Sequence, residues 1–452
     1  MVLKIAAAAA AYFPTDYTLH VVTAIVVVIL ARVISQGRRT SRDRDLHARV
    51  ILLTGGFTPF GLTLLEALAQ RGAHVIALTP YPVESEVVTT YIDLLRSATS
   101  NEQIFAETCD LDSPPSIHAF GARFAKNQEQ RIDAVIFAHE YRHVGALGKR
   151  RNWEQDEMRR ETASLATFLL TTLLLPVLLT APAERDIRII NIVNRFYPAA
   201  IPSFASNGSS EAPHSFAFNQ GVKPKSTFLA EGIRSLRTVI LARHLQRILD
   251  ALPNSAPLPK PSEQNAAPVP VVRPGTGSQR SNIVALSVSP GLSRAETIAP
   301  LLGGNVLGML FYAIMYPFLL VFAKSAAASI ETVLHSLFLP TPFKVMSAEE
   351  LPRHQSQERE VLKPGALYAE CSVAKVPMRV EVETATEAAS MEKPVEGKEE
   401  LKMVEDGELG GEVLGRRVWE AYEMGLKTWN AAHPDPEPQP VETDVDQSRT
   451  TT

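Results

Sequence analysis

The chain has 452 residues, of which 45% are hydrophobic and 21% charged, so it holds enough apolar material for one large core or two average domains. The formal net charge of −4 provides no concentrated basic surface, which excludes nucleic acid as a partner. The two cysteines, Cys109 and Cys371, are too few for a disulfide framework or a cysteine-rich metal site and favour a reducing compartment. We therefore expect a globular protein with no metal site.

An apolar segment at residues 19–35 follows a leader of residues 1–18 and approaches the length of about 20 residues that crosses a bilayer. The basic residues that come directly after it are Arg38, Arg39, Arg42 and Arg44. By the positive-inside rule these residues place the following domain in the cytosol. We predict a transmembrane anchor at residues 19–35 in the endoplasmic reticulum membrane. A mitochondrial membrane is the alternative location, and a buried helix of the domain is the other interpretation of the segment.

A glycine-rich turn lies between a predicted strand at residues 49–53 and a predicted helix, and a second strand follows at residues 74–78. The turn reads TGGFTPFG from Thr54 to Gly61. Glycines let the backbone approach a diphosphate, while the start of the helix offers free N–H groups to it. The pattern predicts a dinucleotide site, and a tight turn that binds nothing is the other interpretation.

This turn resembles the TGxxxGxG turn of the short-chain dehydrogenase/reductase family, with Thr54, Gly55 and Gly61 in place and Pro59 at the middle glycine. The resemblance covers residues 49 to about 370 and is to the fungal, membrane-anchored type with a degenerate active site. It implies an α/β domain at residues 49–376 with a doubly wound, mostly parallel, Rossmann-like sheet, preceded by the transmembrane helix.

The resemblance also implies NAD(P) as cofactor, bound at the glycine turn and at later strand ends. The implied cofactor-binding residues are Thr54, Gly55, Gly56, Gly61, Asp110, Ala138, Pro290 and Gly291. Pro59 has no amide N–H to offer a phosphate, and Thr79-Pro80 ends the second strand where NAD-dependent proteins place a carboxylate on the ribose. We therefore expect weak NAD(P) binding or none. Asp110 is equally explained as the cap of the next helix.

The family's catalytic asparagine, serine, tyrosine and lysine fall, by this resemblance, on Ala163, Asn194, Val222 and Ser226. A valine cannot donate the proton that the tyrosine supplies, so no catalytic residue is assigned. Tyr197, in a loop after a strand, is the alternative proton donor. His139 and Glu140 follow another strand, but we expect their side chains to point in different directions.

Several further segments are predicted in chain order. Residues 252–281 are rich in proline and serine and predict a disordered insertion. Residues 298–323 are uncharged and predict a membrane-contacting helix. We favour a helix that lies in the interface over a second transmembrane span. Beyond the domain we expect an acidic linker (377–412), an amphipathic helix (413–430) and a disordered tail (431–452).

The sequence therefore predicts a membrane-anchored, short-chain-dehydrogenase-like protein with an impaired active site and a scaffolding or regulatory role. Its expected partners are the membrane and proteins bound through the acidic linker and the carboxyl-terminal helix. The alternative is an active NAD(P)-dependent oxidoreductase that acts on a lipid-like substrate with a non-standard proton donor.

Overall fold

The computed structural model describes residues 17–126, 131–142, 144–146, 153–182, 185–205, 218, 226–255, 281–341, 360–378 and 407–434. Four sequence predictions fall largely or wholly outside these residues, namely the leader 1–18, the insertion 252–281, the linker 377–412 and the tail 431–452. They stay predictions.

The described residues form an eight-stranded sheet with the strand order β3-β2-β1-β4-β5-β6-β7-β8. The strands are β1 (Val50–Thr54), β2 (His74–Thr79), β3 (Ile104–Thr108), β4 (Ala134–Phe137), β5 (Ile187–Ile192), β6 (Ile283–Ser289), β7 (Leu367–Ala369) and β8 (Ser372–Val373). All neighbouring strands are parallel except β7 and β8. The doubly wound, mostly parallel α/β fold is confirmed.

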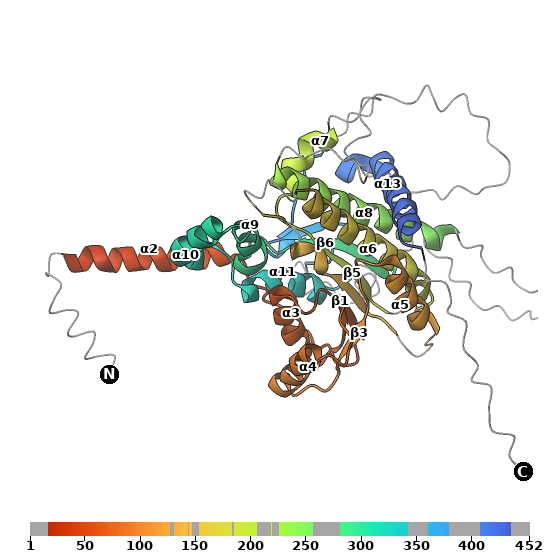
Figure 1. Ribbon diagram of the computed structural model, residues 1–452, viewed down its shortest axis with the longest axis horizontal. Helices are drawn as coiled ribbons and strands as arrows, with labels where there is room; N and C mark the ends of the chain where they lie inside the picture. The colour runs from red at the N-terminus through yellow and green to blue at the C-terminus, as the bar shows by residue number, and fades with distance from the viewer. Residues whose placement is uncertain are drawn as a thin grey trace, which may run out of the picture.

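Helices cover both faces of this sheet (Figure 1). One face is covered by α3 (Pro59–Ala69), α4 (Glu86–Thr99) and α11 (Ala326–Phe338), and the other by α5 (Pro114–Lys126), α6 (Trp153–Leu179) and α8 (Thr227–Ser255). Along β1, the side chains of Ile51 and Leu53 pack in the apolar layer with α3, α4 and α11. Those of Val50 and Leu52 pack in the layer with α5, α6 and α8. Every residue of β1, β4, β5 and β6 is buried, as expected for strands between two helix layers.

The helix α13 (Gly411–Ala432) adds an outer layer on α8 and α6 and begins after the short turn η7 (Glu408–Gly410). Its apolar face packs inward: the Tyr422 hydroxyl lies 2.6 Å from Ser164 Oγ, and Trp419 meets Phe168 at 5.1 Å between ring centroids. The sequence predicted this helix at 413–430. The contacts of Tyr422 and Trp419 bury the apolar face of α13 against its own domain.

Two apolar helices lie together outside the domain (Figure 1). The first, α2 (Thr18–Gln36), projects from the molecule with exposed side chains and is one of two described helices long and apolar enough to cross a membrane. The other is α6, which is largely buried in the core. The helix α10 (Val306–Phe322) has no buried residue and packs beside α2. It is reached from β6 through the π-helix η6 (Arg294–Ile298) and α9 (Ala299–Leu302).

Hydrogen bonds and an ion pair hold the segment between α2 and β1 against the domain. At its start the Gln36 side chain donates to the Ala323 carbonyl (3.1 Å) and accepts from the Ser325 amide (3.0 Å). Further on, the Thr40 amide donates to Glu331 (3.0 Å), and Arg44 pairs with the buried Asp186 (3.2 Å). The apolar helix pair is thus joined to the domain at several points.

Candidate functional site

The glycine turn joins β1 to α3 at the carboxyl edge of the sheet. Thr58 caps α3 by accepting the Gly61 amide (3.0 Å), and Pro59 takes the first helical position, which proline favours because its N–H would be unused there. A Cβ on Gly61 would lie 2.1 Å from the Gly55 carbonyl oxygen, and Gly55 has φ +66°. Packing of the turn itself therefore requires both glycines.

A carboxylate of the same chain lies at the start of α3. Glu296, on η6, accepts the Phe60 amide at 2.9 Å and is 2% exposed. Burial raises the pKa of Glu296, against opposing effects of the Phe60 amide, the Arg142 charge and the Thr58 hydroxyl. Since Pro59 has no N–H and the Gly61 amide bonds to Thr58, the first three residues of α3 leave no free amide for an external anion.

Doubly wound sheets bind dinucleotides in a cleft at the carboxyl ends of their strands. A buried tyrosine occupies the part of that region next to the turn. Tyr141 belongs to the short helix η2 (His139–Arg142) after β4 and is 1% exposed. Its ring packs against Phe60 with 5.1 Å between centroids, and its hydroxyl donates to the Gly291 carbonyl at 2.9 Å. The adjoining Pro290 carbonyl accepts from the buried Lys324 ammonium at 3.0 Å, so both carbonyls of the Pro-Gly turn bond within the chain.

The strand-end residues beside the turn are also bonded to one another. Thr54 Oγ1 accepts the Ala138 amide at 3.1 Å and lies 2.8 Å from His139 Nδ1. The other ring nitrogen of His139 lies 3.0 Å from the Ala163 carbonyl, and burial lowers the pKa of this histidine. His139 thus ties the end of β4 to α6 as a neutral ring.

A buried ion network fills the region behind Tyr141. Arg234 of α8 pairs with both Glu140 and Glu231, and these three residues are at most 1% exposed. Burial opposes the charged guanidinium, but the carboxylates of Glu231 and Glu140 raise the pKa of Arg234 above its ordinary value. Thr167 and Thr238 donate to Glu140, so the network is supplied with further hydrogen bonds.

Of the catalytic positions inferred from the sequence, Asn194 belongs to this network and Ala163 lies beside it. Asn194 is 0% exposed, and its amide group donates to Glu231 (2.8 Å) and to the Tyr141 carbonyl (3.0 Å). Ala163 is buried, whereas Ser226 is exposed just before α8. Val222 lies outside the described residues. Tyr197 is half-buried at the start of η3 (Tyr197–Ala200), just before α7 (Ile201–Ala205), and burial raises its pKa.

A ribose would lie near the carboxyl ends of β2 and β3. The residues there bond locally. Thr79 is buried and accepts the Tyr81 amide through its hydroxyl at 3.2 Å. Asp110 accepts the Asp112 amide at 3.0 Å, and its own amide bonds to Ser116 of α5 at 2.9 Å. Asp110 therefore forms a local turn four residues before Pro114, where α5 begins, and does not cap that helix.

These contacts test whether the cleft fits NAD(P). A bound diphosphate needs free amides at the start of α3 and room beside the Pro-Gly turn. In the described structure Glu296 holds the Phe60 amide and Tyr141 covers the Gly291 carbonyl. The residues as arranged do not fit the dinucleotide.

The sequence identified the glycine and Pro-Gly turns but not the side chains that close them. Glu296, Tyr141 and Arg234 carry no motif, and Glu296 is separated from Phe60 by 236 positions. The one available signal was the placement of Glu140 three residues after the end of a buried strand, where a carboxylate needs a partner.

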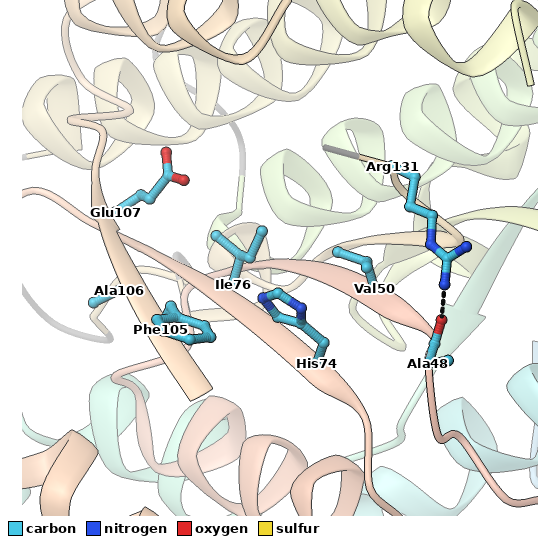
Figure 2. Close-up of a pocket in the computed structure, with 8 residues that line it drawn as sticks. All are labelled: Ala48, Val50, His74, Ile76, Phe105, Ala106, Glu107 and Arg131. Atoms are coloured by element: carbon cyan, nitrogen blue, oxygen red, sulfur yellow. Dashed lines mark hydrogen bonds between the residues drawn. The ribbon is translucent and has the colours of Figure 1, made fainter. Parts of the chain in front are cut away.

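A separate cavity of about 510 Å³ lies at the opposite edge of the sheet (Figure 2). It is lined by residues of β1, β2 and β3 and of the segments just before β1 and β4, namely Ala48, Val50, His74, Ile76, Phe105, Ala106, Glu107 and Arg131. Dinucleotides bind at the carboxyl ends of such strands, so this cavity is not the cofactor site. Among the residues that the structure describes, no group of three or more histidine, cysteine or acidic side chains could hold a metal ion.

The doubly wound sheet, the glycine turn after β1 and the Pro-Gly turn after β6 are the features on which the chain's resemblance to short-chain dehydrogenases rests. The chain is 22% identical over 308 residues to the uncharacterized oxidoreductase pbr1 of Schizosaccharomyces pombe, covering 68% of this chain and 74% of that protein. An uncharacterized oxidoreductase of Saccharomyces cerevisiae is 28% identical over 320 residues, covering 68% and 71%.

A short chain dehydrogenase from Salmonella enterica serovar Typhi is a similar solved structure, with 19% identity and a TM-score of 0.39 over 64% of this chain and 97% of that one. No protein-family model matches the chain.

Proposed function

We propose that this chain is a membrane-attached, short-chain-dehydrogenase-like protein that has lost hydride-transfer catalysis and serves as a scaffold or regulator. The observation that carries the proposal is the environment of Asn194. This position, which by resemblance holds the substrate-binding serine, is 0% exposed and bonded to Glu231 and Tyr141. A side chain so enclosed cannot contact a substrate oxygen.

The proposed loss of catalysis is supported by the other positions. Ala163 has no group that can relay a proton, and the exposed Ser226 accepts the Phe228 amide with its hydroxyl (3.3 Å) and the Ala230 amide with its carbonyl (3.0 Å). Tyr141 is the tyrosine beside the Pro-Gly turn, but its proton is donated to the Gly291 carbonyl and burial raises its pKa. A buried phenol with a raised pKa is a poor proton donor at neutral pH.

Catalysis is tested with the full chain in detergent, supplied with NADPH or NADH and lipid-soluble aldehydes and ketones. We expect no oxidation of either nucleotide above a protein-free blank. Turnover that disappears in Tyr197→Phe or Tyr141→Phe would instead establish an active oxidoreductase and name its donor. Turnover that survives both changes would also defeat the proposal.

The proposed membrane attachment rests on α2 and α10. As a 19-residue helix, α2 is about 28 Å long and nearly matches the hydrocarbon core of about 30 Å. The 17-residue α10 is about 25 Å long, contains Pro317 and is joined to the domain at both ends. We propose that α2 spans the bilayer and that α10 lies in its interface with exposed Leu310, Phe311 and Ile314 among the lipids. The acidic linker and the exposed face of α13 are the proposed protein-binding parts.

Vesicle flotation combined with alkaline extraction distinguishes a spanning α2 from an α10 that lies in the interface. We expect the full chain to resist extraction at alkaline pH, and a chain lacking residues 1–36 to float with vesicles but to be stripped by that extraction. Adding Phe311→Asp to the shortened chain should release it from vesicles altogether, because a carboxylate opposes entry into the interface. Alkaline resistance of the shortened chain would contradict an interfacial α10, and its failure to float would contradict any lipid contact.

A further inference from the structure

The start of α3 is bonded to a carboxylate that the chain itself supplies. Phe60, the second residue of α3, donates its amide to Glu296 Oε1 at 2.9 Å. Free amides and the helix dipole attract an anion at such a position. The buried carboxylate therefore takes the place that one phosphate of a dinucleotide would occupy.

Glu296 is held there by more than one contact. It is part of η6, where the Ser293 hydroxyl accepts the Glu296 amide at 3.4 Å and fixes the turn. The next residue, Thr297, donates to the Tyr141 hydroxyl at 3.4 Å, and Tyr141 in turn bonds to Gly291. Residues from η6, η2 and α3 thus close the cleft as one cluster, which we name the Glu296 plug and define as Phe60, Tyr141, Glu296 and Thr297.

We propose that the Glu296 plug is an autoinhibitory contact, in which a nucleotide phosphate and the Glu296 carboxylate compete for the start of α3. The proposal goes beyond the proposed function, because it concerns access to the cleft and not chemistry within it. Nucleotide binding requires η6 to move away from α3. Since η6 continues through α9 into α10, the plug is carried by the segment that leads to the proposed membrane-contacting helix.

The competition predicts a gain of binding when the carboxylate is removed. Glu296→Ala frees the Phe60 amide and opens the space of the side chain, and Glu296→Gln keeps the shape but removes the charge. We expect the dissociation constant for NADPH, measured with the full chain by nucleotide fluorescence, to fall at least tenfold in Glu296→Ala and less in Glu296→Gln. Inorganic pyrophosphate should compete with NADPH in both variants, because the gain arises at the phosphate position.

Glu66→Ala is the matched control, because Glu66 lies on the exposed surface of the same helix and bonds only to Gln70 among the contacts described. It should bind NADPH as the unaltered chain does. Circular dichroism checks folding of each variant, and Glu296→Gln decides the matter if Glu296→Ala does not fold. Equal NADPH affinity in the folded Glu296 variants and the unaltered chain would overturn the proposal, as would a gain that pyrophosphate does not compete away.

Discussion

Replacing Arg234 by methionine is expected to lower the free energy of unfolding by about 3–5 kcal/mol, the usual loss when one partner of a buried ion pair is removed. The guanidinium lies between Glu140 and Glu231, which are 1% and 0% exposed. Without it, two buried carboxylates face each other with no counter-charge and must take up protons or draw in water. Urea unfolding of the full chain in detergent at pH 7 measures the loss.

Two variants test the electrostatic cause. Arg416→Met makes the same substitution in an exposed pair with Glu420, whose side chains are 70% and 59% exposed, and should cost less than about 1 kcal/mol. Adding Glu140→Gln and Glu231→Gln to Arg234→Met should recover much of the lost stability, because no unpaired charge remains buried. A loss in Arg234→Met no larger than in Arg416→Met would contradict the importance of the network.

Replacing Tyr422 by alanine is expected to lower the free energy of unfolding by about 3–5 kcal/mol, the range for deleting a large buried aromatic side chain. Tyr422 is 0% exposed and packs against Phe168 with 5.2 Å between ring centroids. The change removes the central contact between α13 and the domain. We expect α13 to become sensitive to limited proteolysis, which mass spectrometry of the fragments would detect.

Tyr422→Phe separates the ring from its hydroxyl. It keeps the packing and loses the hydrogen bond with Ser164 Oγ (2.6 Å), so a loss of about 1 kcal/mol with α13 still protected is expected. Equal losses in the two variants would show that the hydroxyl, and not the packing of α13, is the important contact.

The fold could be predicted because its signals are local. The strand at residues 49–53, the glycine turn and the strand at residues 74–78 follow one another in the sequence, and each has its own pattern of apolar residues or glycines. The structure places them as β1, the turn and β2 of a parallel pair. Buried strands between helices leave little choice of architecture.

The closure of the site could not be predicted in the same way. Tyr141 and Glu296 come from segments far apart in sequence, and only the adjacency of β1, β4 and the β6 side of the sheet brings them to Phe60. Pro59 was expected to weaken a phosphate site through its missing amide, and the structure adds that proline is well suited to the first position of α3. The sequence could show which family side chains are replaced, but not which of its own side chains fill the cleft.

The link between α2 and β1 has a mechanical consequence. If residues 37–49 made no contact with the domain, these thirteen residues could extend to about 45 Å and would let the domain move freely relative to its anchor. In the structure, Thr40 and Arg44 are bonded to the domain, and Gln36 is hydrogen-bonded to Ala323 and Ser325. With α2 in a bilayer, the domain would keep one height and one tilt above the lipid. A partner that recognises α13 would then always meet it at the same distance from the membrane.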